Sequence, residues 1–159
     1  MIPAVIDTPR LRLDAPTSAD RGLIVEYCQD PVFERFLTLP WPYTERDADY
    51  FIEKLVPHGW EQRVEYTWAI RRAPEPTGAG EADLLGVIGF RAGPGSIGFW
   101  LGSPHRGFGY MPEAVRAVTA SLFEAGWPKS RGSVWWATRR PLPSPASVVS
   151  TFPASARQL

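Results

Sequence analysis

The sequence is poor in the residue types that build disulfides and metal centres. Its 159 residues include one cysteine, Cys28, and two histidines. A single cysteine cannot form an internal disulfide, which favours a reducing, cytoplasmic location. One cysteine and two histidines also give no recognisable zinc-binding spacing, so we expect no metal site.

The chain also lacks a long apolar run and an excess of charge of one sign. No apolar stretch approaches the roughly 20 residues that a membrane-spanning helix needs, and the N-terminal MIPAVIDTPR lacks the basic-then-apolar order of a signal peptide. The 17 basic and 17 acidic residues cancel. We therefore expect neither a membrane nor a nucleic acid as a partner. The 44% hydrophobic content is enough for the core of one domain.

Acidic residues are missing from the last part of the chain. Residues 1–127 contain 12 basic and 17 acidic residues, whereas residues 128–159 contain 5 basic residues, none acidic, 5 prolines and 6 serines. Such a change in composition is typical of a segment that does not build a core. We therefore divide the chain into a domain over residues 1–138 and an atypical Pro/Ser/Arg-rich C-terminal segment over residues 139–159.

Hydrophobic periodicity and turn residues predict an ordered series of helices and strands. A first helix is expected after a cap at Thr17, and it stops or restarts at Asp30-Pro31. Further helices are expected over 44–56 and from about 110 to Gly126. The strands are expected over 10–13, 65–71, 84–91, 96–101 and 133–138. This order predicts an α+β fold, a mixed sheet with helices on its faces.

The segment GFWLGSPHRGFGYMPEAV, residues 98–115, joins a predicted strand to a predicted helix through a glycine-rich turn. The first N–H groups of a helix favour an anion, and glycine lets the backbone approach it closely. Arg106 adds a charge suited to phosphate. The segment therefore predicts pyrophosphate binding. The alternative is that Gly107 and Gly109 only shape the turn, because the pattern lacks the third glycine of a dinucleotide fingerprint and the chain has no G-x-x-x-x-G-K-[ST] loop.

The longer segment IGFWLGSPHRGFGYMPEAVRAV resembles the signature of the GNAT superfamily of acyl-CoA-dependent N-acetyltransferases. TPRLRL at 8–13, the acidic-Pro pair at 30–31, a Trp/Pro/Tyr loop and GVIGF at 86–90 are similar to the branch that includes the ribosomal-protein-alanine N-acetyltransferases. The resemblance covers about residues 7–127. It implies a mostly antiparallel sheet flanked by helices, acetyl-CoA as co-substrate, and a primary amine as acceptor, either a protein N-terminus or a small molecule.

The resemblance also implies the site residues. Acetyl-CoA is expected along strand 96–101 and the loop that follows it. The backbone of Phe99, Trp100 and Leu101 would meet the pantetheine and the acetyl carbonyl. The pyrophosphate would be held by the amides of Arg106, Gly107, Phe108, Gly109 and Tyr110. Trp41 and Tyr43, on a loop stiffened by prolines, are expected to border the acceptor pocket, with packing on the core as the alternative.

Acetyl transfer from a thioester needs a neutral amine, a donor for the oxyanion and a proton for the leaving thiolate. By resemblance, the oxyanion donor is a strand amide near Trp100 or Leu101. Four carboxylates are candidates for the base, with a surface charge as the alternative for each: Glu26, Glu34, Glu65 and Glu113. We select Glu65 because it begins a strand expected beside the cofactor strand. His58 and His105 are expected at the surface without a role.

After Thr138 the resemblance ends. The family would continue with an Asn-containing loop, a helix bearing a serine, and two final strands, but this chain contains no asparagine and ends RRPLPSPASVVSTFPASARQL. Ser147 is the best match to the family's serine, which would protonate the leaving thiolate. We expect the last strands to be missing through a shifted reading frame or a truncation, which sequencing the coding DNA tests.

Loss of those strands has two consequences. Strand 133–138 would become an exposed edge with two tryptophans, which favours a homodimer. A purely monomeric sedimentation profile would count against it. The alternative to an enzyme is a non-catalytic acyl-CoA-binding protein or a degenerate acetyltransferase.

Overall fold

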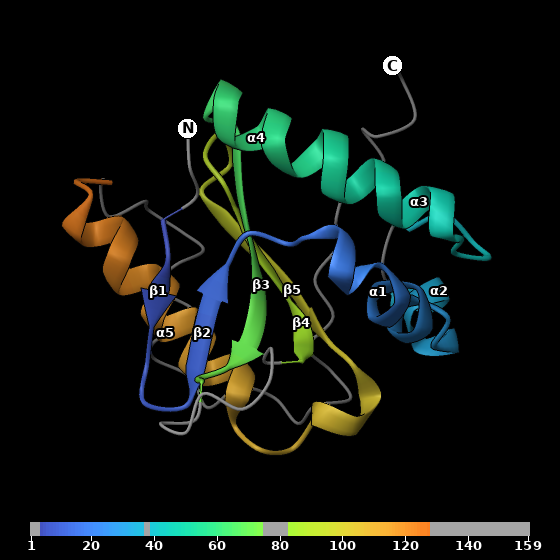
Figure 1. The fold of residues 1–159 in the computed structure, drawn as a ribbon. Coiled ribbons are helices and arrows are strands. Elements are labelled where there is room, and N and C mark those ends of the chain that lie inside the picture. The colour runs from blue at the N-terminus through green and yellow to red at the C-terminus, as the bar shows by residue number, and fades with distance from the viewer. Residues whose placement is uncertain (1–3, 37–38, 75–82, 128–159) are drawn as a thin grey trace.

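The computed structural model describes residues 4–36, 39–74 and 83–127. Within them, antiparallel strands form one sheet, and their order in the sheet is their order along the chain (Figure 1). The strands are β1 (Ile6–Asp7), β2 (Leu11–Asp14), β3 (Glu65–Arg72), β4 (Leu84–Arg91) and β5 (Ser96–Leu101). The expected strand over 133–138 and the segment over 139–159, including Ser147, lie outside the described residues.

The helices follow the predicted order. They are η1 (Ser18–Asp20), α1 (Arg21–Cys28), α2 (Pro31–Phe36), α3 (Glu45–Tyr50), η2 (Phe51–Leu55), α4 (Val56–Gln62), η3 (Ser103–His105) and α5 (Tyr110–Glu124). The expected restart at Pro31 is confirmed, since α2 begins there. The Thr17 backbone N–H donates to Asp20 Oδ2 over 2.7 Å, which confirms the capping residue before α1. The α+β prediction is therefore confirmed.

The helix predicted over 44–56 is longer than its sequence indicates. It continues through Pro57 to Gln62, because the π-helical segment η2 ends at Leu55 and Pro57 falls in the first turn of α4. A proline inside an α-helix lacks the N–H of the helical ladder, and a π turn changes which groups must pair. The sequence prediction ended this helix at Val56. Arg63, in the left-handed region with φ +57°, ends the helix.

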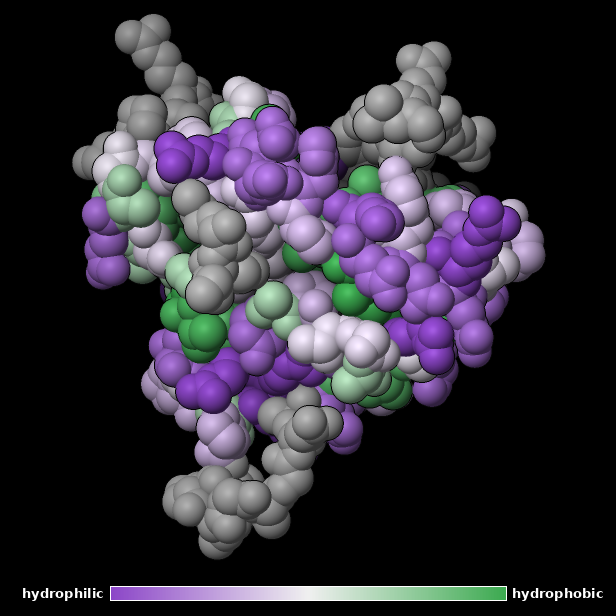
Figure 2. All heavy atoms as spheres, turned by 45° about the horizontal axis from the view of Figure 1, so that its top comes forward, coloured by the Kyte–Doolittle hydropathy of each residue, from purple (hydrophilic) through white to green (hydrophobic). Residues whose placement is uncertain are grey.

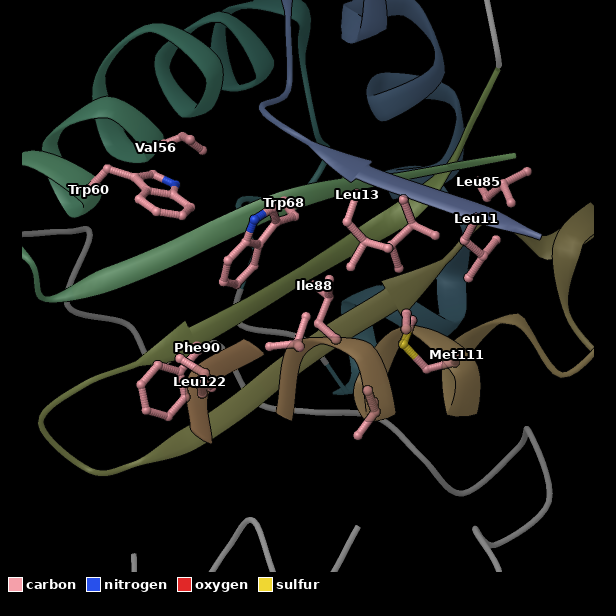
Figure 3. Packing of buried hydrophobic residues seen from close by; sticks show 14 residues of the cluster. Leu11, Leu13, Val56, Trp60, Trp68, Leu85, Ile88, Phe90, Met111 and Leu122 are labelled. Atoms are coloured by element: carbon pink, nitrogen blue, oxygen red, sulfur yellow. The ribbon is translucent and has the colours of Figure 1, made fainter. Parts of the chain in front are cut away.

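Helix α5 packs against one face of the sheet. Its buried residues Met111, Ala114, Val115, Val118 and Leu122 meet Leu11, Leu13, Trp68, Ile70, Leu85, Ile88 and Phe90 from the strands. Figure 3 shows Met111 and Leu122 on the helix side of this cluster, with Val56 and Trp60 of α4 at its other end. The rings of Trp60 and Trp68 meet edge to face, with centroids 5.1 Å apart. This packing fixes the direction of α5 relative to the sheet.

Trp100 of β5 belongs to a second cluster, which also contains buried residues of α1, α2 and α3. Its ring lies 6.3 Å from the Tyr27 ring of α1 and 5.7 Å from the Phe33 ring of α2. Because strand side chains alternate, Phe99 and Leu101 instead contact the α5-side cluster. Strand β5 is therefore anchored on both faces just before the glycine-rich loop.

Candidate functional site

The loop between β5 and α5 contains two residues with positive φ, Gly107 at +86° and Gly109 at +77°. Residues with a side chain rarely adopt this conformation, which explains the glycines. The N–H groups of Gly107, Phe108, Gly109, Tyr110 and Met111 have no hydrogen-bond partner among the residues that the structure describes. These N–H groups, which we call the amide cradle, stand at the positive end of the 15-residue helix α5. An anion such as a phosphate fits this arrangement.

The Arg106 side chain does not face the amide cradle. Its Nε and Nη2 donate to the Leu101 carbonyl over 3.1 and 3.0 Å, and Nη2 lies 3.1 Å from Asp30 Oδ2. The guanidinium also lies over the Phe33 ring, 5.2 Å from its centroid. Its charge therefore pairs with a carboxylate rather than standing free for a phosphate. The Arg106 backbone N–H donates to Ser103 over a long 3.4 Å.

His105 has a partner that the sequence did not indicate. Tyr27 Oη and His105 Nε2 are 2.8 Å apart, and their rings meet edge to face. Burial lowers the pKa of His105, helped by the charge of Arg72 and opposed by that of Asp83. The expectation that His105 lies at the surface is wrong, because Tyr27 of α1 half-buries its ring. His58 is exposed as expected.

The backbone N–H groups of β5 alternate between those that bond to β4 and those that point away from it. The Gly102 N–H donates to the Leu85 carbonyl of β4 over 2.9 Å. In an antiparallel ladder the N–H of Trp100 then also points to β4, and those of Phe99 and Leu101 point away from it. Of the two expected oxyanion donors, this geometry favours Leu101. The Leu101 carbonyl is already bound by Arg106.

Glu65 does not lie on a strand beside β5. Strand β4 separates β3 from β5, because the tight turn at 92–95 makes β4 and β5 a hairpin. The expected adjacency is therefore wrong. The carboxylate nevertheless reaches over β4, since a methyl group on Gly89 would meet Glu65 Oε1 at 3.5 Å, and Gly89 pairs with Gly98 of β5.

The surroundings of Glu65 change its proton affinity. Burial raises the pKa of this carboxyl group, and the charge and hydrogen bonding of Arg91 partly oppose the rise. The ion pair is long, with 3.8 Å between Arg91 Nε and Glu65 Oε1. A half-buried carboxylate with a raised pKa is a suitable proton acceptor near neutral pH.

The other candidate carboxylates are less suitable as bases. Glu26 and Glu34 are exposed. Glu113, in the first turn of α5, accepts 2.6 Å hydrogen bonds from Thr8 Oγ1 and Arg10 Nε. Burial would raise the pKa of Glu113, but these hydrogen bonds outweigh it and the pKa falls. This carboxylate therefore has a weaker affinity for a proton than an ordinary glutamate.

The two aromatic residues expected at the acceptor pocket differ in exposure. Tyr43 is 4% exposed and belongs to the Trp100 cluster, as the core-packing alternative proposed. Trp41 is 40% exposed. Of the pair, Trp41 is the residue that an acceptor can reach.

Neither a metal cluster nor a membrane-spanning helix occurs among the described residues. No group of three or more His, Cys, Asp or Glu side chains in this part of the chain is arranged to hold a metal ion. No helix within it has the length and apolar character to span a bilayer.

The fold is α+β, and the amide cradle at the start of α5 is an arrangement that suits a phosphate-bearing co-substrate. Residues 10–140 match the family described as acetyltransferase (GNAT) domain, and the chain belongs to this family. Membership supports acetyl transfer with acetyl-CoA as the donor. A search of the curated proteins found no match.

Solved structures of acetyltransferases share this fold. The acetyltransferase from Agrobacterium tumefaciens is 21% identical, with a TM-score of 0.60 over 80% of this chain and 72% of that chain. RimL, the ribosomal L7/L12 α-N-protein acetyltransferase in complex with coenzyme A, is 16% identical, with a TM-score of 0.61 over 77% and 70%. The microcin C7 self-immunity acetyltransferase MccE, in complex with acetyl-CoA and AMP, is 16% identical, with a TM-score of 0.59 over 75% and 66%. At these identities the likeness shows the fold alone.

Proposed function

We propose that the protein transfers the acetyl group of acetyl-CoA to a primary amine. The observation that carries the proposal is the amide cradle, which lies between η3 and the first turn of α5 in a chain of the GNAT family. Five N–H groups without a partner among the described residues, in the loop and the first turn of α5, would form a strong site for the pyrophosphate of CoA. The strand before the loop would then carry the pantetheine arm.

The proposed chemistry uses residues on and beside β5. The neutral amine attacks the thioester carbonyl carbon, the carbon–sulfur bond breaks, and CoA leaves as a thiolate that takes up a proton. The Leu101 N–H would donate to the oxyanion, and Phe99 would offer its outward backbone to the pantetheine. Glu65 would accept the amine proton through a water molecule, since its raised pKa suits that role. Ser147, the proposed proton donor to the thiolate, lies outside the described residues.

For the acceptor we propose a protein N-terminal amine, with a small-molecule amine as the alternative. RimL, whose fold this chain shares, is described as an α-N-protein acetyltransferase. The exposed Trp41 offers an apolar surface that could cover a peptide N-terminus. Similarity of fold does not by itself identify a substrate, so the acceptor must be found by measuring turnover.

The test combines turnover and binding. Thiol release is followed with acetyl-CoA and a panel of amines and peptides that begin with alanine or serine, and CoA binding is measured by calorimetry. Turnover on any acceptor supports the enzyme. Binding without turnover supports the second candidate, a non-catalytic acyl-CoA-binding protein, which the departure of residues 139–159 from the family pattern favours. Absence of CoA binding overturns both.

A further inference from the structure

The turn between β1 and β2 sends one side chain onto the glycine-rich loop. Arg10 Nη1 donates to the Phe108 carbonyl over 2.9 Å, and Arg10 Nη2 donates to the Gly109 carbonyl over 3.2 Å. Its Nε donates to Glu113 Oε2 over 2.6 Å. The guanidinium also lies 5.0 Å from the centroid of the Tyr110 ring. A single planar group therefore holds two consecutive carbonyls of the loop and the first turn of α5.

The two carbonyls determine the direction of two N–H groups. In a trans peptide the C=O and the N–H point in opposite directions. The Phe108 carbonyl shares its peptide with the Gly109 N–H, and the Gly109 carbonyl shares its peptide with the Tyr110 N–H. Arg10 holds both carbonyls on its own side, and the Gly109 carbonyl also accepts from the Glu113 N–H over a long 3.4 Å. Both cradle N–H groups are therefore aimed at the opposite side, away from the guanidinium.

Arg10 also pairs with a carboxylate in the first turn of α5. Glu113 stands in the first turn of α5, where its charge would repel a bound phosphate. Its Oε2 accepts from Arg10 Nε, and its Oε1 accepts from the Arg10 backbone N–H over 3.2 Å and from Thr8 Oγ1 over 2.6 Å. The carboxylate is thus turned toward the β1–β2 turn and its charge is paired.

We propose that Arg10 is a positioning residue for the pyrophosphate of CoA, acting through the peptides of Phe108, Gly109 and Tyr110 without touching the ligand. The inference rests on the proposed function, because it needs a pyrophosphate in the amide cradle. The proposed role of Arg10 needs the forked, planar guanidinium group, because an ammonium group is a point donor and cannot hold two carbonyls and a carboxylate in one plane. If Arg10 only stabilised the contact between the β1–β2 turn and α5, its loss would affect ligands with and without a pyrophosphate equally.

The experiment compares two acetyl donors in Arg10→Gln, Arg10→Lys and Arg12→Gln. Arg12→Gln is the matched control, since it removes the same charge two residues further along the chain, on β2, where Arg12 pairs with Asp7 at the surface. The donors are acetyl-CoA and S-acetyl-pantetheine, which lacks the pyrophosphate. We expect Arg10→Gln to raise the KM for acetyl-CoA about tenfold or more. Its kcat/KM with S-acetyl-pantetheine should stay within about twofold of the wild type.

Arg10→Lys should lose nearly as much affinity for CoA, measured by calorimetry, as Arg10→Gln, and Arg12→Gln should lose none. Equal losses with both donors, or full rescue by lysine, would overturn the proposal. If the wild-type protein binds no CoA, the proposed function has failed. The backbone amide ¹⁵N relaxation of residues 107–111 then tests the positioning alone, and unchanged relaxation in Arg10→Gln relative to Arg12→Gln overturns it.

Discussion

Arg106 Nη2 lies 3.1 Å from Asp30 Oδ2, and this ion pair joins the loop after β5 to the junction of α1 and α2. Both side chains are largely buried, with 27% and 18% exposed. The same guanidinium donates to the Leu101 carbonyl at the end of β5. One side chain therefore links the proposed cofactor loop to α1 and α2, the helices against which the Trp100 ring packs.

Breaking this pair should destabilise the fold. Because the charges are partly desolvated, we expect a coupling of about 1–2 kcal/mol between Arg106→Gln and Asp30→Asn in a double-mutant cycle of urea unfolding. The control cycle uses Arg21 and Asp49, an exposed pair at 3.4 Å, where about 0.5 kcal/mol or less is expected. Equal couplings in the two cycles would show that the Arg106–Asp30 pair is no more than a surface contact.

His105 should make stability depend on pH. Its pKa in the folded protein lies below the ordinary value of 6.5, so the unfolded chain binds the proton more readily. Stability is therefore full above about pH 6.5 and falls as the pH decreases below it. We expect the fall in Tm between about pH 7 and 5 to be smaller in His105→Gln than in the wild type. His58→Gln, at an exposed site, is the control and should follow the wild type.

Gly107→Val tests the placement of the amide cradle. A Cβ atom at Gly107 would meet nothing within 4 Å, but the φ of +86° strains a β-branched residue by about 1–3 kcal/mol. The loop should therefore change conformation and lose CoA affinity in calorimetry. The matched control is Gly93→Val, in a turn with equal space and no positive φ. Unchanged CoA affinity in Gly107→Val would place the pyrophosphate elsewhere.

The sequence predicts the elements whose pattern is local. Strands 84–91 and 96–101 have the predicted bounds, because alternating apolar residues and the tight turn between them leave little freedom. Helix α5 follows its stripe of apolar residues and ends before Gly126, whose φ is +82°. Strand β1, with two residues, is too short to show an alternation. It forms only because β2 offers a neighbouring edge.

The side-chain partners in the site could not be predicted, because they come from distant parts of the chain. Tyr27 and His105 are 78 positions apart, and Arg10 reaches Phe108 over 98 positions. No periodicity or motif records such a pairing. Arg106 illustrates the limit: an arginine before two glycines indicates a phosphate ligand, but the position of Asp30 in the fold decides where its charge is paired.

Glu65→Gln tests the proposed base. The pKa of Glu65 lies above its ordinary value of 4.5, so the carboxylate takes up a proton, and the base is lost, as the pH falls through that raised pKa. We expect Glu65→Gln to lower kcat about 100-fold or more and to remove this acidic limb from the pH profile of kcat. Glu61→Gln, at an exposed position of α4, is the control and should change neither.

The acceptor amine also changes its protonation with pH, so a second variant must identify which group causes the acidic limb of the pH profile of kcat. Arg91 lowers the pKa of Glu65 by its charge and hydrogen bond, against the larger effect of burial. Arg91→Gln should therefore raise the pKa further and move the acidic limb of kcat to higher pH, whereas the pKa of the free amine is the same with both proteins. A limb that stays at the wild-type pH in Arg91→Gln, or that persists in Glu65→Gln, would assign the proton transfer to another group.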